Sequence, residues 1–390
     1  LITGGELGGL IEFRSKSLDS AKNELGRIAV SLSLTFNAQH SLGQNMLGQI
    51  EGEAGFIGNF FSVPDPRILT NSENQGSGSM SATFTAAQHN GNFYTDLTGS
   101  DYQLTFGAGG AYSIMRLSDK QVVSTGTGPG TATFDGIELA ITATGDNGDR
   151  FLIKPTDEAA RNIAMNATLA SDPRLINAAA PMRTVPNQAN AGAMTISQGE
   201  VSTGYSTVGL PLTLTVTAGN LSGLPGDWEV IYANGVTQTG TGGTIPLTNG
   251  AATLSKIVYQ GMSFNVAGTP ADGDSFTIER NAGGVQDGRN AVLLGKLQTA
   301  TTMVGGQATF QSVYSSLVSA NGVKTRSAKL GLESQEAVLK QATANRDAFS
   351  AVNLDEEAAN LLKFQQAYQA SAKVIEIASN LFDTLLSIGR

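Results

Sequence analysis

The sequence contains no cysteine among its 390 residues, which excludes disulfide bonds and thiolate metal sites. Histidine is almost as scarce, because only His40 and His89 are present. Neither histidine has a second ligand or an acid/base partner at the spacing of a known motif, and no HExxH sequence occurs. We expect both histidines to lie on the surface, and we predict a protein that is not an enzyme and has no metal site and no cofactor.

Charge and long apolar runs are also sparse. Charged residues make up 15% of the chain, and the formal net charge is −9 at pH 7. Phosphate binding needs clustered Lys and Arg, which this acidic chain lacks. No apolar run approaches the roughly 18 residues that a membrane-spanning helix needs. We therefore expect neither nucleic acid nor a membrane as a partner.

Glycine, in contrast, is abundant, with 47 residues. Together with few aromatic residues, this composition is typical of short strands joined by many turns. The length exceeds that of one ordinary domain and predicts two to four units. The sequence begins with Leu1 rather than Met and shows no signal peptide, so we expect a chain that lacks its N-terminal part.

The first 45 residues are expected to form a helical segment with a strand-like start. Glycine punctuation between apolar residues makes Leu1–Phe13 resemble a strand. After a possible N-cap at Ser17, apolar residues recur at helical spacing, which predicts an amphipathic helix that ends near His40. The stripe comprises Leu18, Ala21, Leu25, Ile28, Ala29, Leu32 and Phe36.

Two β-rich domains are predicted next, at 46–183 and 184–285. Alternation of apolar residues marks a hairpin across Gly107–Gly110 in the first, and another before the Asn234-Gly235 turn in the second. The first domain also carries a short helix, expected around Glu158–Leu169. The Pro/Asn/Ala-rich segment that follows has an exposed composition, so proteolysis is expected to cut first near Asn177–Ala191.

The ends of the two β-rich stretches resemble each other at a constant offset of 125 residues. FDGIELAI at 134–141 and GDRFLI at 148–153 align without gaps with YQGMSFNV at 259–266 and GDSFTI at 273–278. This match indicates two copies of one strand–turn–strand module. The acidic turns at 146–149 and 272–274 could suggest calcium, but they lack a twelve-residue loop with a terminal Glu, so hairpin turns explain them better.

Residues 286–390 are predicted to be helical, because helix formers dominate from Thr309 onward and no proline follows Pro270. A heptad of apolar residues runs through the last part of this region. It predicts either the core of a helical bundle or an assembly surface for a partner helix. The candidate assembly residues are Leu354, Leu361, Phe364, Tyr368, Ile375, Phe382 and Leu385.

The run NLDEEAANLLKFQQAYQA at 353–370 resembles the C-terminal signature of flagellar axial proteins. The ending SNLFDTLLSI at 379–388 and the opening GELGGLIEFRS at 5–15 are similar to the hook-associated protein 1 family within that class. The resemblance implies an α+β multidomain fold, with long α-helical terminal segments and β-rich domains inserted between them. It also implies that the family's N-terminal half, with the helix that pairs with 354–388, is missing here.

The function implied by the resemblance is structural: a secreted, extracellular subunit that joins hook to filament by helical self-assembly after type III export. The implied partners are copies of itself, the hook protein, the adjacent junction protein and an export chaperone at the C-terminal helix. Two alternatives remain open. One is another axial protein such as a flagellin. The other is an extracellular module that binds a glycan or host surface, for which Trp228, Tyr232 and Tyr205 are the aromatic candidates.

Overall fold

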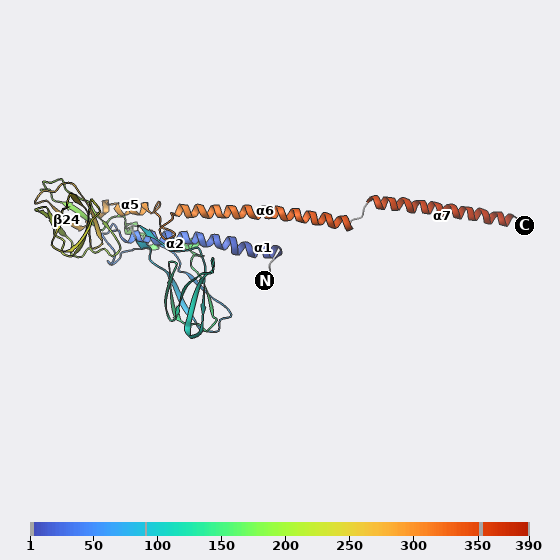
Figure 1. Ribbon diagram of the computed structural model, residues 1–390, viewed down its shortest axis with the longest axis horizontal. Coiled ribbons are helices and arrows are strands. Elements are labelled where there is room, and N and C mark those ends of the chain that lie inside the picture. Colours follow the sequence, from blue (N-terminus) through green and yellow to red (C-terminus); the bar gives the residue numbers. More distant parts are fainter. Residues whose placement is uncertain (1–3, 90–91, 351–353, 389–390) are drawn as a thin grey trace. The chain divides into compact units, whose positions relative to one another are not determined.

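The computed structural model describes residues 4–89, 92–350 and 354–388, which fall into two compact units, 1–321 and 322–390. Helices occupy both ends of the described chain, and β-strands occupy the region between them (Figure 1). This arrangement confirms the predicted α+β multidomain class with terminal helices and inserted β-rich domains.

The N-terminal region is helical from its first described turn. Helix α1 (Gly5–Phe13), the π-helical turn η1 (Arg14–Leu18) and helix α2 (Asp19–Ser41) follow one another without a break. The strand-like start was therefore wrong over Gly5–Phe13, where Leu7, Leu10 and Ile11 have helical spacing. Ser17 lies inside η1 and caps nothing, whereas the predicted end near His40 is confirmed.

The first β-rich domain contains two antiparallel sheets, with strand orders β2-β11-β6-β7-β8 and β3-β10-β9. Their inward side chains share one hydrophobic core, in which Tyr102, Leu104, Ile114 and Ile153 are fully buried. The predicted hairpin across Gly107–Gly110 is the pair β6–β7. The strands are β2 (Arg67–Thr70), β3 (Ser79–Phe84), β6 (Tyr102–Phe106), β7 (Ala111–Arg116), β8 (Val122–Thr127), β9 (Gly130–Phe134), β10 (Ile137–Ala143) and β11 (Arg150–Lys154).

The second β-rich domain repeats this plan. One sheet has the order β13-β24-β16-β17-β20 and the other β14-β23-β22-β18-β19, with β15 and β21 as short additions. Its core is separate and is drawn wholly from residues between Met182 and Ile278. The strands are β13 (Met182–Pro186), β14 (Thr195–Ile196), β15 (Glu200–Val201), β16 (Leu212–Thr217), β17 (Asn220–Ser222), β18 (Asp227–Tyr232), β19 (Thr237–Thr241), β20 (Thr244–Pro246), β21 (Thr248–Asn249), β22 (Ala252–Tyr259), β23 (Met262–Ala267) and β24 (Ser275–Arg280).

The sequence repeat occupies the same place in both domains. It covers hairpin β9–β10 and strand β11 in the first, and hairpin β22–β23 and strand β24 in the second. Both hairpins turn through two residues with positive φ, Asp135-Gly136 (43° and 76°) and Gln260-Gly261 (47° and 73°). Such a turn matches the right-handed twist of the flanking strands.

Short elements connect the first domain to the helices. Strand β1 (Phe61–Ser62) pairs with β12 (Ala164–Met165), and β4 (Gln88–His89) pairs with β5 (Phe93–Tyr94). The single helix predicted at Glu158–Leu169 was wrong, because β12 separates α3 (Ala159–Asn162) from α4 (Ala167–Ser171). Asn166 starts α4 by accepting a hydrogen bond from the Thr168 N–H. Single 3-10 turns are η2 (Ala108–Gly110), η3 (Pro173–Leu175) and η4 (Gly284–Gln286).

Helices follow the second β-rich domain in the described residues, as the sequence predicts. Helix α5 (Arg289–Lys296) packs on α2 within the first unit. Helix α6 (Phe310–Ser350) begins in the first unit and continues into the second, and α7 (Leu354–Ile388) belongs to the second. None of the helices in the described ranges is both long enough and apolar enough to cross a membrane.

Candidate assembly surface and domain junction

All seven predicted assembly residues lie on α7, and every one of them is between 63 and 80% exposed. Residues seven apart drift by about 20° per heptad on a straight helix, so this stripe winds around α7 along its length. A partner helix that follows the stripe must supercoil with α7. The second unit therefore presents a long apolar face that its own described residues leave uncovered.

The apolar face is wider than the sequence list. Five further exposed residues lie on or beside the stripe in the last turns of α7, namely Val374, Ile377, Leu381, Leu386 and Ile388. At about 100° per residue, apolar side chains here cover roughly half of the helix circumference. A fixed seven-residue spacing missed these residues, whereas a helical wheel of 370–388 would have found them.

Helices α1 and α2 expose a second apolar face, in the first unit. Leu7, Leu10, Ile11 and Phe13 are 49 to 59% exposed, and Leu25 of the predicted stripe is 41% exposed. The packed face of α2 is instead small and polar, and consists of Asn23, Gly26, Ala29, Val30, Ser31, Ser33, Thr35, Gln39 and His40. Of the predicted apolar stripe, only Leu18 and Leu25 are exposed, whereas Ala29 is buried and the other four residues are partly buried.

His40 lies at the centre of a buried polar junction, so the expectation of a surface histidine was wrong. Its Nδ1 is 2.7 Å from the Gly58 carbonyl oxygen, and its Nε2 accepts a hydrogen bond from the Asn177 N–H at 3.0 Å. A carbonyl can only accept and an N–H can only donate, which fixes the neutral tautomer with the proton on Nδ1. Burial lowers the pKa of His40, and the bond to Gly58 opposes this shift. The side chain of His89 lies outside the described residues.

The same junction buries the first part of the expected cleavage segment, whereas residues 185–189 of that segment are exposed. Asn177 is fully buried, and its side-chain amide donates to the Ile57 carbonyl at 2.9 Å. Its own carbonyl accepts from the Asn290 amide at 2.6 Å, and Asn290 in turn accepts from Gln39 of α2 at 2.7 Å. Asn177 and residues 179–182 are therefore buried rather than exposed, and Asn177, the one polar side chain among them, finds buried partners.

The acidic turns are structural, as the sequence favours. Asp149 accepts hydrogen bonds from the N–H groups of Gln75, Gly76 and Asp146. Asp274 accepts from the N–H groups of Ala191, Gly192 and Ala271, and these bonds lower its pKa. No group of three potential metal-ligating side chains occurs within the described part of the chain.

Each of these aspartates also holds a loop that the sequence reading missed. Asn74 pairs with the main chain of Arg150 through both atoms of its amide, and Asn190 pairs with Ser275 in the same way. The loops read NSENQG at 71–76 and NQANAG at 187–192, an offset of 116 rather than 125. A comparison of the two stretches would align these loops together with the repeat only if it allowed a gap of nine residues.

The aromatic cluster considered for glycan binding is not an exposed platform. Trp228 and Tyr232 are 6% and 1% exposed and belong to the second core. Burial, followed by the charge of Glu51, raises the pKa of Tyr205 to about 12. These residues stabilise the domain and offer no stacking surface for a sugar.

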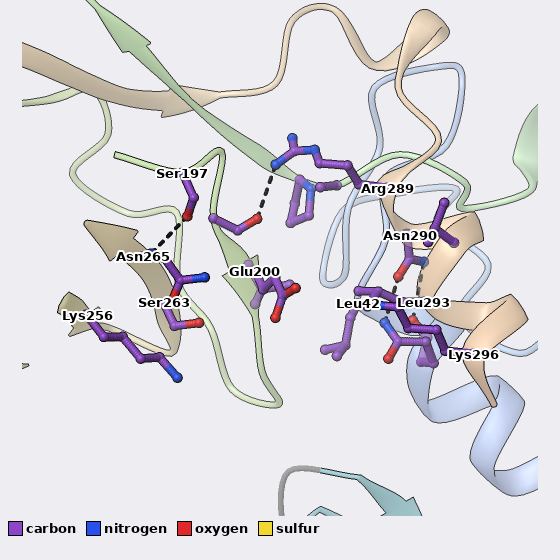
Figure 2. Close-up of a pocket in the computed structure, with 16 residues that line it drawn as sticks. Leu42, Ser197, Glu200, Lys256, Ser263, Asn265, Arg289, Asn290, Leu293 and Lys296 are labelled. Atoms are coloured by element: carbon purple, nitrogen blue, oxygen red, sulfur yellow. Dashed lines mark hydrogen bonds between the residues drawn. The ribbon is translucent and has the colours of Figure 1, made fainter. Parts of the chain in front are cut away.

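A cavity of about 310 Å³ lies between the second β-rich domain and helices α2 and α5 (Figure 2). Leu42, which directly follows α2, and Val292 and Leu293 of α5 line one side. Ser263 and Asn265 of β23 and Ser197, which directly follows β14, line the other side. The domain and the helices are therefore incompletely packed along this side.

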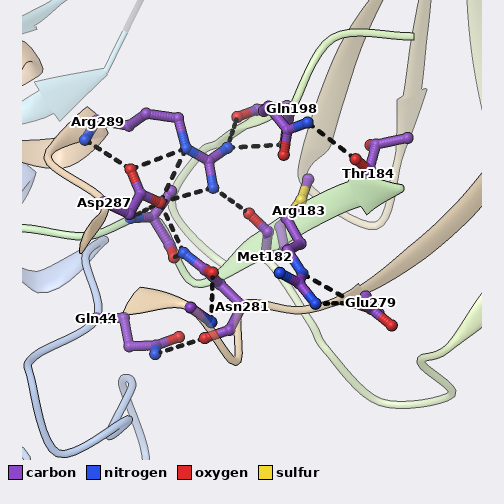
Figure 3. A network of polar contacts seen from close by, with 12 residues as sticks. Gln44, Met182, Arg183, Thr184, Gln198, Glu279, Asn281, Asp287 and Arg289 are labelled. Carbon is purple, nitrogen blue, oxygen red and sulfur yellow. Dashed lines mark hydrogen bonds and ion pairs between the residues drawn. The ribbon is translucent and has the colours of Figure 1, made fainter. Parts of the chain in front are cut away.

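Beside the cavity, a polar network joins the same two parts (Figure 3). Arg289, the first residue of α5, forms an ion pair with Asp287 at 2.8 Å. Burial raises the pKa of Asp287, but hydrogen bonds from Arg289 outweigh burial and hold the pKa below its usual value. Asp287 also accepts from the side chain of Asn281, whose carbonyl accepts from Gln44 at 2.9 Å.

Comparison with known proteins agrees with this architecture. Residues 1–56 match the family described as flagellar hook-associated protein FlgK helical domain, and 69–155 match flagellar hook-associated protein 1, D2-like domain. Residues 346–388 match flagellar basal body rod FlgEFG protein C-terminal. The structure of the flagellar hook junction protein FlgK from Burkholderia pseudomallei is 33% identical, with a TM-score of 0.77 over 90% of this chain and 63% of that one.

These matches support a protein of the flagellar hook-associated protein 1 type. Its relative of that name from Escherichia coli strain K12 is 26% identical over 389 residues, which are 100% of this chain and 50% of the relative. The Bacillus subtilis member is 28% identical over 170 residues, 40% of this chain and 31% of the relative. The chain thus spans about half the length of the first curated relatives that it matches.

Proposed function

We propose that this chain is part of a structural, non-enzymatic subunit that joins hook to filament in the bacterial flagellum. The observation that carries the proposal is the apolar face of α7, which has the family's C-terminal sequence and needs a partner. Full burial of a large apolar side chain contributes about 1.5–3 kcal/mol, so the seven assembly residues together contribute on the order of 10 kcal/mol before ordering costs.

The proposed partners are copies of the same protein, the hook protein and the adjacent junction protein, assembled outside the cell after type III export. We further propose that an export chaperone binds the C-terminal helix, because the same apolar face must be covered before assembly. The likeness to proteins whose names place them at the hook junction supports this set of partners.

We also propose that the chain is organised as predicted, with a helical segment at 1–45, β-rich domains at 46–183 and 184–285, and a helical region at 286–390. The two separate hydrophobic cores support the division between the β-rich domains. Two hydrogen bonds between Gln39 of α2 and Asn290 of α5 support packing of the 1–45 segment against the first part of 286–390.

The test is the double change Leu361→Asp and Ile375→Asp in the full-length protein. Two carboxylates on the apolar face should abolish incorporation at the hook–filament junction and weaken the chaperone complex, since a charge buried without a partner is strongly unfavourable. Thermal unfolding of the β-rich domains should not change.

The matched control is Gln369→Asp with Asn380→Asp, which places the same two charges on the polar face of α7. Immunolabelling of flagella and binding to the purified chaperone are the measurements. Normal junctions with both apolar positions replaced would show that α7 is not the assembly surface.

A further inference from the structure

The second β-rich domain is attached to the helices at one point of the chain. It begins with β13 and ends with β24, and these strands are neighbours in the same sheet, with Met182 paired to Arg280. An attachment through two adjacent strands leaves a domain free to bend and twist about that point unless other contacts hold it.

Apolar packing does not supply those contacts on the side of the cavity. The 310 Å³ space is lined by Ser263 and Asn265 on the side of the domain and by Leu42 and Leu293 on the side of the helices (Figure 2). The domain's core contains no residue from α2 or α5. What fixes its angle must therefore lie elsewhere in the interface.

Arg289 reaches from α5 past this cavity to the domain itself. Its guanidinium donates to the carbonyls of Gln198 at 2.8 Å and Gly199 at 3.1 Å, in the segment between β14 and β15. It donates to the Met182 carbonyl at 2.6 Å, where β13 begins. One side chain thus holds the domain at its attachment and also at a segment distant from it in sequence.

Asp287 fixes the direction of that guanidinium and ties in the opposite end of the attachment. It pairs with Arg289 on one side and accepts from the Asn281 amide on the other, immediately after β24 (Figure 3). Asn281 also donates to the Ala180 carbonyl at 2.9 Å. Planar Arg–carboxylate pairs are more directional than contacts to Lys.

We infer that Arg289 and Asp287 form a polar clamp that holds the second β-rich domain in one orientation on the helical region. The domain is then a rigid part of the subunit and not a tethered module, and Arg289 is a positioning residue for it. The inference concerns the shape of the subunit, so it is independent of the proposed role at the hook–filament junction.

Single-molecule energy transfer tests the clamp in the full chain. Because the chain has no cysteine, Ser20→Cys on α2 and Thr237→Cys on β19 give two unique sites for dyes, both at exposed positions. The parent should give one narrow distribution of transfer efficiency. Arg289→Ala should broaden it, with Trp228 fluorescence still reporting a folded second domain.

Arg183→Ala is the matched control, because Arg183 forms a comparable pair with Glu279 entirely inside the second domain, at 2.8 Å. It should leave the distribution narrow. If the far-UV circular dichroism of Arg289→Ala shows that the variant is unfolded, Asp287→Asn replaces it as the test. Asp287→Asn should also broaden the distribution of transfer efficiency. A parent that is already broad, or folded clamp variants as narrow as the parent, would overturn the inference.

Discussion

The two β-rich domains share a strand order but differ in how they join the helices. The first includes α2 in its core, because Ala29 and Val30 pack among its strands. The second takes all its core residues from between Met182 and Ile278. The same strand order can thus occur in a domain that shares its core with a helix and in a domain that has a core of its own. The residues at the boundary with the helices determine which of the two forms.

Polar contacts show the same difference. In the first domain, Asn23 of α2 donates to Asp101 at 2.9 Å, and Thr156 donates to the Asn23 carbonyl at 2.9 Å. These bonds lie beside a continuous apolar core, whereas Arg289 lies beside a cavity. We therefore expect substitutions that destabilise α2 to destabilise the first β-rich domain as well, and to leave the stability of the second β-rich domain almost unchanged.

The largest effect is expected from Val30→Asp. Val30 is fully buried, and an unpaired carboxylate there should cost on the order of 4 kcal/mol or more, enough to unfold the helical region with the first domain. Trp228, the single tryptophan, lies in the second core and should report an almost unchanged urea transition. Far-UV circular dichroism should report the loss.

Val292→Asp is the control, because this side chain is 61% exposed on α5 and should tolerate the change. If Val30→Asp shifts the tryptophan transition as far as the circular dichroism transition, the two domains fold as one, and the comparison fails.

Gly43→Ala should have the next largest effect, about 1–3 kcal/mol. A Cβ at this position would collide with the Asn177 carbonyl oxygen and the Asn290 amide, both part of the buried junction. Gly288→Ala is matched, since nothing lies within 4 Å of a Cβ there. Equal unfolding midpoints for the two variants would show that the junction relaxes easily.

Asp149→Asn and Asp274→Asn should have similar, smaller effects, each confined to its own domain. An asparagine amide cannot accept from three backbone N–H groups as a carboxylate does, so each loop loses part of its support. The midpoint of the urea transition followed by Trp228 fluorescence should move to a lower urea concentration for Asp274→Asn. It should not change for Asp149→Asn. A shifted midpoint for both variants, or for neither, would contradict the view that each aspartate stabilises a loop of its own domain independently.

The smallest effect is a pH dependence at His40. Its pKa is lowered in the folded state, so the unfolded chain binds this proton more readily. The stability given by neutral His40 is fully present above the ordinary histidine pKa of about 6.5 and is lost as the pH falls through the lower folded pKa.

Urea unfolding of the parent and of His40→Gln, measured from pH 8 down to the range where carboxylates titrate, isolates this dependence by difference. The two curves should diverge below about pH 6.5. Parallel curves would mean that the junction does not sense the charge of the imidazole.

Sequence reasoning succeeded where a pattern is local. The hairpin turn at Asn234-Gly235, the end of α2 near His40 and the heptad of α7 all follow from spacing within a few residues. The repeat at 125 residues also led correctly to two hairpins in the same place of two similar domains.

It failed where the answer depends on a distant partner. Asn177 and His40 are polar, and the sequence predicts that both are exposed. They are buried because the fold brings them into contact although they are 137 residues apart in the sequence. Arg289 and Asp287 had no signal, since their targets are main-chain carbonyls, which every residue carries. The largely small and polar face of α2 was likewise not predicted to be buried, because its burial depends on residues distant in the sequence that pack against it.

The neighbouring positions of β13 and β24 have a consequence for how this part of the protein can change. Because the chain leaves and re-enters the helical region about one strand spacing apart, roughly 5 Å, another domain with equally close ends could replace this one without moving α2 or α5. Evolution can vary the outer surface at this location while the helices stay constant. A designer could use the same position to display a foreign domain.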